Sequence, residues 1–221
     1  MKDRPKKPDR YAPEREQMVT EQLVRRDIID LRVLNAMRRV PRHLFVPEKH
    51  LGDAYRDSPL SIGMGQTISQ PYVVASMTQQ LQLKPDHKVL EVGTGCGYQA
   101  AVLAELVRQV FTVELIPELH ERARRNLKKA GYQRVQSRVA DGASGWPEKG
   151  PFDAIIVTAA APRLPSELIG QLKTGGRLVI PLAAEQWGRQ YLHKITRTAQ
   201  GLSNRRLYEV RFVPMVGEIE R

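Results

Sequence analysis

The sequence has a single cysteine, Cys96, so it can form neither an intrachain disulfide nor a zinc cluster built on cysteines. No apolar run approaches the ~18 residues that a membrane-spanning helix requires, and the charged first residues contain no apolar segment like that of a signal peptide. The five histidines lack the paired spacing of metal ligands. We therefore expect a soluble, cytoplasmic protein with no metal site and no membrane partner.

Linkers and internal repeats are also missing, which predicts one folded domain rather than two. We expect a disordered basic tail over residues 1–13 and a single domain over residues 14–221. Within that domain, residues 14–84 should supply N-terminal helices and an active-site segment. Residues 85–182 should form a cofactor-binding core, and residues 183–221 a C-terminal hairpin.

The formal net charge of the 221 residues is +11. Basic residues gather in the tail and in the stretches 120–129 and 204–211. Solvated faces and a disordered tail are the interpretation we favour. A nucleic-acid surface is the alternative, because basic patches raise the affinity for phosphate groups without sequence preference. The charge alone does not decide between them.

After Pro85 short apolar strands alternate with amphipathic helices, which is typical of a parallel sheet covered on both faces. Before it, helical spacing predicts two opening helices, the second capped by Asp30, and a further helix that starts at Pro71. Two segments on either side of Gly201 should form an antiparallel hairpin. The other expected strands are 88–93, 110–115, 135–141, 152–158 and 177–182, and the helices between them are 98–107, 117–130 and 165–173.

The predicted fold class is thus α/β. We expect a doubly wound, Rossmann-like sandwich with a mostly parallel seven-stranded sheet, an antiparallel C-terminal edge and N-terminal helices. In such a sheet ligands bind outside the carboxyl ends of the strands, where the strand order reverses. Functional residues are therefore sought in the loops that follow the strands.

The strongest chemical signal is the stretch "EVGTGCGYQA" at residues 91–100, between a buried strand and a helix. Its alternating glycines Gly93, Gly95 and Gly97 would let a ligand approach the backbone closely. A dinucleotide fingerprint, G-x-G-x-x-G, would need a glycine where Tyr98 stands. The spacing therefore favours a different nucleotide-like cofactor.

Carboxylates end the next two strands. Glu114 is placed to accept hydrogen bonds from a ribose diol, and Asp141 with Gly142 is placed beside an adenine. Either carboxylate alone would be read as a surface charge. Both together, at neighbouring strand ends beside the glycine loop, favour a cofactor site.

The spacing G-x-G-x-G resembles motif I of the S-adenosylmethionine methyltransferases, and other stretches narrow the resemblance. From about Met18 to Gly217 the chain resembles the protein-L-isoaspartate O-methyltransferase family, through "GQTISQPYVVASM", "VLEVGTGCGYQAAVLA", "FDAIIVTAAAP", "LKTGGRLVIPL" and "VRFVPMVG". The resemblance implies S-adenosyl-L-methionine as the cofactor. It also implies methyl transfer to the α-carboxyl of L-isoaspartyl residues in damaged proteins and peptides, giving an ester that collapses to a succinimide.

The segment "TIS" carries the expected catalytic residues. The resemblance marks Ser69 as an active-site residue, whereas the residues alone favour Ser69 as the N-cap of the helix at Pro71, and the two roles are compatible. Thr67 is expected beside it as a second neutral donor. The expected cofactor-binding residues are Gln66, Ile68, Glu91, Gly93, Thr94, Gly95, Gly97, Glu114, Leu115, Asp141, Gly142 and Thr158.

The implied reaction needs no general base, because an α-carboxyl with a pKa near ~3.5 is already ionised at neutral pH. A carboxylate and a sulfonium give two neutral products, so alignment and exclusion of water are what the protein must supply. Neutral side chains such as Ser69 and Thr67 suit this task.

Two other classes of function stay open. A nucleic-acid methyltransferase would explain the charge, but amino-group methylation of bases is associated with an Asn/Asp-Pro-Pro-aromatic loop after the fourth strand, where this chain has "TAAAP". A non-catalytic binder of S-adenosylmethionine is the other. We expect damaged isoaspartyl proteins as partners, no specific nucleic acid, and a monomer.

Overall fold

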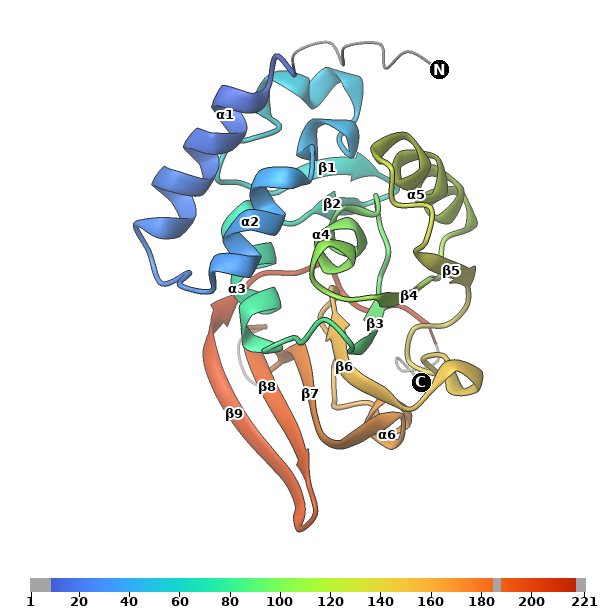
Figure 1. Ribbon diagram of the computed structural model, residues 1–221. Coiled ribbons are helices and arrows are strands. Elements are labelled where there is room, and N and C mark those ends of the chain that lie inside the picture. The colour runs from blue at the N-terminus through green and yellow to red at the C-terminus, as the bar shows by residue number, and fades with distance from the viewer. Residues whose placement is uncertain (1–8, 185–187, 218–221) are drawn as a thin grey trace.

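A seven-stranded sheet forms the centre of the molecule in the computed structural model, which describes residues 9–184 and 188–217 (Figure 1). The strand order is β5-β4-β3-β6-β7-β8-β9. The pairs among β5, β4, β3, β6 and β7 are parallel, whereas β8 pairs antiparallel with both β7 and β9. This confirms the predicted fold. The strands are β3 (Lys88–Val92), β4 (Gln109–Glu114), β5 (Gln136–Val139), β6 (Phe152–Val157), β7 (Leu172–Ala183), β8 (Gln190–Thr198) and β9 (Gly201–Val210).

Alternate residues of the strands enter two separate hydrophobic clusters, one on each face of the sheet. In β3, Val89 belongs to the cluster under helices α3 (Pro71–Gln80), α4 (Tyr98–Leu106) and α5 (Pro117–Ala130), while Leu90 belongs to the other. The second face is covered more sparsely, by α6 (Ser166–Gly170) and the segment around Trp146, followed by the 3-10 turn η4 (Pro147–Lys149). The core is therefore divided by the sheet into two layers.

The N-terminal helices pack beside α3 and α4 (Figure 1). Helix α1 (Ala12–Gln17) continues into the π-helical turn η1 (Met18–Val24), and α2 (Leu31–Arg39) is capped by Asp30, whose carboxylate accepts a hydrogen bond from the Arg32 amide at 2.9 Å. The cap at Asp30 is as predicted.

Only part of the expected tail over 1–13 falls within the described residues. There α1 already begins at Ala12, and Asp9 forms an ion pair with Arg15 at 2.6 Å. Ordered structure thus starts earlier than the sequence indicated, whereas residues 1–8 lie outside the described part of the chain. None of the helices among the described residues has both the length and the apolar character needed to cross a membrane.

The stretch between α2 and α3 contains two 3-10 turns and a small hairpin. The turns are η2 (Arg42–Leu44) and η3 (Glu48–Asp53), and the hairpin pairs β1 (Leu60–Gly63) with β2 (Gln66–Ile68) antiparallel. Its tip has positive φ at three successive residues, including the non-glycine Met64 at 55°. Thr67 and Ile68 of the "TIS" motif therefore lie in a strand, and Ser69 directly follows it, which sequence reasoning missed.

The helix expected over 165–173 is wrong at its C-terminal end. The strand β7 already begins at Leu172, and its register with β6 shifts between Leu172 and Arg177. Gly176 lies within this irregularity, where an added Cβ would be 2.8 Å from the Lys173 carbonyl oxygen. Gly175 and Gly176, which directly follow the range expected to be helical, therefore lie in a bulge inside a strand.

Candidate active site

The strand order reverses beside β3, the strand that carries the glycine loop at its carboxyl end. From β3 the chain moves outward to β4 and β5 and then returns to β6 on the other side of β3. A cavity with about 860 Å³ of empty space, partly open to solvent, lies at this edge. Its position is that of a small-molecule site in an open α/β sheet.

Most of the residues expected at the cofactor and catalytic sites line this cavity. The structure brings together Gln66, Thr67, Ile68, Ser69, Glu91, Gly93, Thr94, Gly95, Glu114, Leu115, Gly142 and Thr158. They come from the β1–β2 hairpin and the residue after it, from the ends of β3 and β4, and from the loops that follow β3, β4, β5 and β6.

Gly97 and Asp141 do not line the cavity. Gly97 is the N-cap of α4 with φ +91°, and an added Cβ would meet the Leu127 side chain of α5 at 3.1 Å. Because Gly97 has no side chain, α4 can pack closely against α5. Asp141 accepts a hydrogen bond from the Ala143 amide at 2.8 Å and lies against Gly217, just behind the cavity wall.

The glycine loop is fastened to β6 through Thr158. The Thr158 hydroxyl donates to the Gly93 carbonyl oxygen at 2.6 Å, and Gly93 has φ +94°. An added Cβ at Gly93 would lie 2.4 Å from the Thr158 Oγ1, so both the backbone conformation and the space require glycine there.

Glu114 fastens the same loop to β4. One carboxylate oxygen accepts from the Gly95 amide at 2.7 Å, and the other accepts from the Ile116 amide at 3.1 Å. Each carboxylate oxygen has a second lone pair, so Glu114 can hold the loop and accept hydrogen bonds from a ligand in the cavity.

Two buried acceptors in the cavity wall have no donor among the described residues. Glu91 Oε2 accepts from the Thr112 hydroxyl at 2.6 Å, but Glu91 Oε1 is unpaired. Gln99 donates from its amide to Thr78 at 2.9 Å, but its Oε1 is also unpaired. Burial, reinforced by the nearby Glu114 charge, raises the pKa of Glu91 to about 8. Unpaired buried acceptors match a ligand that brings N–H donors.

Gln99 was missed by sequence reasoning. The only signal was its position in the first turn of the helix that follows the glycine loop. The second missed group is the segment from Val213 to Val216, which closes the cavity from the C-terminal side. Backbone hydrogen bonds of 2.8 Å join it to Ala160, after β6, and the stretch "VRFVPMVG" was its signal.

Ser69 and Thr67 lie in the cavity wall with hydroxyl groups that make no hydrogen bond within the described part of the chain. The N-cap of α3 is Gln70, and no side chain caps that helix. The expectation that Ser69 caps the helix is therefore wrong. Its hydroxyl is available to a ligand.

A second cavity adjoins the first at Ser69. It shares Thr67, Ser69, Thr158 and Val213 with the cofactor-side cavity, and it has about 1290 Å³ of empty space including open solvent. Aromatic side chains form part of its wall, namely Tyr72, Tyr208 and Phe212. No group of three or more acidic, histidine or cysteine side chains that could hold a metal ion occurs among the described residues.

A glycine loop at the strand reversal, a carboxylate at the end of β4 and the antiparallel strand β8 define the class of Rossmann-like methyltransferases. The family model described as "Protein-L-isoaspartate(D-aspartate) O-methyltransferase (PCMT)" matches residues 14–220. The chain therefore belongs to the protein-L-isoaspartate O-methyltransferase family.

Relatives and solved structures agree with this assignment. Protein-L-isoaspartate O-methyltransferases of Synechococcus sp. (strain JA-2-3B'a(2-13)) and Opitutus terrae are 52% and 54% identical to the chain. The matches cover 94% and 93% of this chain, and 87% and 88% of the relatives.

Among solved structures, a protein-L-isoaspartate O-methyltransferase superposes with a TM-score of 0.86 at 30% identity, covering 93% of this chain and 67% of the other. A Plasmodium falciparum protein described by the same activity was solved with S-adenosyl-L-homocysteine bound. It gives a TM-score of 0.81 at 29% identity, covering 91% of this chain and 98% of the other.

Proposed function

We propose that the protein transfers the methyl group of S-adenosyl-L-methionine to the α-carboxyl of L-isoaspartyl residues in damaged proteins and peptides. The observation that carries the proposal is the family match over residues 14–220, nearly the whole chain. The ester formed in this reaction collapses to a succinimide, whose hydrolysis returns some normal aspartate. The function is therefore protein repair.

The first cavity has the polar groups that S-adenosylmethionine needs. Its unpaired acceptors, Glu91 Oε1 and Gln99 Oε1, suit the ammonium group of the methionine part. Glu114 suits the hydroxyl groups of the ribose, and Gly142 leaves room for a flat base. When bound there, the cofactor supplies an electrophilic methyl group on a sulfonium ion.

The second cavity suits the acceptor peptide. Because the two cavities meet at Thr67 and Ser69, a carboxylate that enters from the second cavity reaches the first at these hydroxyl groups. Ser69 is half-buried and would orient the carboxylate by a neutral hydrogen bond. An oxygen of that carboxylate then forms the bond to the methyl carbon as the carbon–sulfur bond breaks and its electron pair stays on sulfur.

No step of this reaction needs proton transfer. The acceptor is ionised at neutral pH, and the two charges that react cancel. The residues of the site therefore act by alignment and by exclusion of water, for which the hairpin β1–β2 and the segment 213–216 provide walls.

Methyl transfer from radiolabelled S-adenosylmethionine to three acceptors tests the function. We expect methylation of an isoaspartyl peptide, and none of its aspartyl twin or of bulk RNA. Methylation of RNA alone would replace the proposal by a nucleic-acid methyltransferase. If the protein binds the cofactor but methylates none of the three acceptors, the proposal would be replaced by a non-catalytic binder of S-adenosylmethionine. A cytoplasmic location and a monomeric state stay predictions of the sequence.

A further inference from the structure

Arg42 is the largest side chain that is fully buried among the described residues, and the reaction as described does not use it. It opens the turn η2, directly after Pro41. Its Nε donates to the Ala54 carbonyl oxygen, and its Nη2 donates to the Ser69 carbonyl oxygen, both at 2.8 Å. The guanidinium carbon lies 4.8 Å from the centre of the Tyr98 ring.

Within residues 9–184 and 188–217 this guanidinium has no carboxylate partner. None of the ion pairs formed by the described residues involves Arg42, and its buried Nη1 has no hydrogen-bond partner. Burial lowers the pKa of Arg42, but an arginine keeps its proton in proteins. A buried charge without a counter-ion is costly, and a neutral side chain of similar volume would fill this space at lower cost. The charge therefore calls for a functional explanation.

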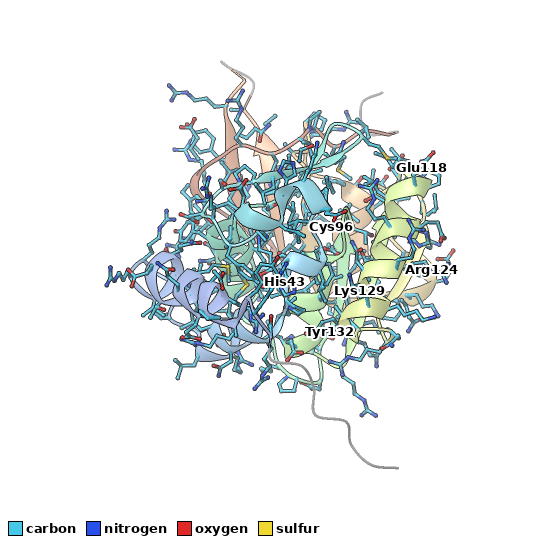
Figure 2. All side chains as sticks on the ribbon, turned by 90° about the horizontal axis from the view of Figure 1, so that it is seen from above. His43, Cys96, Glu118, Arg124, Lys129 and Tyr132 are labelled. Atoms are coloured by element: carbon cyan, nitrogen blue, oxygen red, sulfur yellow. The ribbon has the colours of Figure 1, made fainter. Side chains whose placement is uncertain are left out.

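The position of Arg42 supplies one. Ser69, whose carbonyl it binds, lies where the two cavities meet, and Tyr98, whose ring it faces, lines the cofactor-side cavity. Figure 2 looks down on this region, with His43, the residue after Arg42, and Cys96 of the glycine loop both labelled in the central part of the view. The positive charge thus lies directly behind the wall that the acceptor must reach.

We propose that Arg42 is a positioning residue for the methyl acceptor. Its Nη2 holds the backbone of Ser69, and its charge attracts the α-carboxylate of the isoaspartyl residue to that wall. The inference rests on the proposed function, which supplies the anionic acceptor. An interaction across protein interior is less weakened by water and salt than one across the surface. The charge therefore acts on the acceptor without touching it.

The test compares the binding of two peptides to the protein saturated with S-adenosylhomocysteine, which prevents turnover. One is an isoaspartyl peptide with a free α-carboxylate, and the other is the same peptide with an α-carboxamide. The wild type should bind the carboxylate peptide more tightly. Arg42→Met should reduce this preference by roughly tenfold, the effect of one unit charge at about 10 Å in a partly screening medium. Affinity for the carboxamide peptide should change less.

Arg108→Met is the matched control, because it removes the same charge from an exposed residue just before β4, at the opposite edge of the sheet. It should leave the preference unchanged. Arg42→Lys keeps the charge but cannot make both hydrogen bonds to the Ala54 and Ser69 carbonyl oxygens. It should retain most of the preference for the carboxylate peptide and lower kcat. An undiminished preference in Arg42→Met would overturn the proposal.

If Arg42→Met and Arg42→Lys do not fold, the salt dependence of the wild type's preference for the carboxylate peptide tests the proposal. A preference that survives about 0.5 M sodium chloride supports a buried charge, whereas one that disappears belongs to surface cations and overturns the role of Arg42. Failure of the proposed function looks different, because the wild type would then bind isoaspartyl and aspartyl peptides equally.

Discussion

Glu91 is a carboxyl group buried at the end of β3, and its protonation couples the site to pH. Burial raises its pKa from 4.5 to about 8, so between these values the folded chain holds a proton that the unfolded chain has lost. The folded state binds more protons in this window, and its stability relative to the unfolded state falls as the pH rises.

We therefore expect Glu91→Gln, which cannot ionise, to gain stability relative to the wild type as the pH is raised from about 5 to about 8. Denaturant unfolding of both proteins without cofactor, at a series of pH values, measures the difference. A difference that stays constant with pH would show that Glu91 is not buried as a neutral acid.

Ser69 distinguishes an orienting hydrogen bond from proton transfer. Because the acceptor is ionised, kcat for an isoaspartyl peptide should show no titration of a base between about pH 6 and 8. Ser69→Ala should lower kcat by about 2- to 100-fold, as expected for the loss of one hydrogen bond to a carboxylate, with a smaller change in cofactor affinity.

The measurement is the pH–rate profile of both proteins with the same peptide. A limb near pH 6.5 that disappears in a histidine variant would contradict a reaction without a base. Full activity of Ser69→Ala would remove this residue from the site.

Glu114 is expected to bind the ribose while it also holds the Gly95 amide at 2.7 Å. Glu114→Ala should weaken S-adenosylmethionine binding by about 10- to 150-fold, because hydrogen bonds to a charged acceptor contribute roughly 1.5–3 kcal/mol. Calorimetry measures the affinity, and Glu118→Ala is the control, since Glu118 is exposed on the first turn of α5 (Figure 2). Equal affinities of the two variants would exclude Glu114 as a ligand.

Among the elements, the segment from Val213 to Gly217 depends on one close contact. Gly217 has φ +124°, and an added Cβ would lie 2.4 Å from the Asp141 carboxylate. Gly217→Ala should displace the segment from the cavity wall and weaken cofactor binding measurably by calorimetry. Gly201→Ala carries the same backbone strain, at φ +129°, but has open space around it in the β8–β9 turn, so cofactor affinity should not change. Similar losses in both variants would contradict this role of the segment.

The elements that sequence predicted are those with local signals. Strand β6 ends in the continuous apolar run 154–157, and the glycine loop has a spacing that few other structures require. The hairpin β1–β2 had no such signal, because its strands are three to four residues long and Met64 adopts a conformation typical of glycine. Local pattern also failed at β7, where a glycine pair forms a bulge.

Local signals also made the site residues at the strand ends predictable. The site residues in other parts of the fold were not predictable from the sequence. Glu91 and Glu114 lie at the carboxyl ends of β3 and β4, and Thr158 directly follows β6, so their place at one edge follows from the topology. The unpaired atoms of Gln99 and Arg42 were not predictable, because a missing partner is a property of the folded interior. The sequence shows which polar groups are present, but it does not show which of them lack a hydrogen-bond partner in the folded protein.

At the scale of the whole molecule, the cofactor cavity joins parts of the chain from Gln66 to Val216. A ligand that binds only this assembled state stabilises the entire fold. With S-adenosylhomocysteine at about 100 times its dissociation constant, the gain is roughly 2.7 kcal/mol, and the Tm should rise by roughly 5 to 11 °C. Thermal unfolding followed by circular dichroism measures the shift. Homocysteine, which lacks the adenosyl group, is the control at the same concentration. An equal rise of the Tm with homocysteine would contradict a specific site.

The backbone bridge between Ala160 and the segment that starts at Val213 also has a consequence for biosynthesis. During translation, the glycine loop and the strand ends around it emerge long before the residues that close the cavity. A nascent chain that has been extended only through β8 already contains every expected cofactor ligand, yet it lacks one wall of the site. Ribosome-bound intermediates of this length should therefore be unable to retain the cofactor, and repair activity should begin only after Val216 has been added.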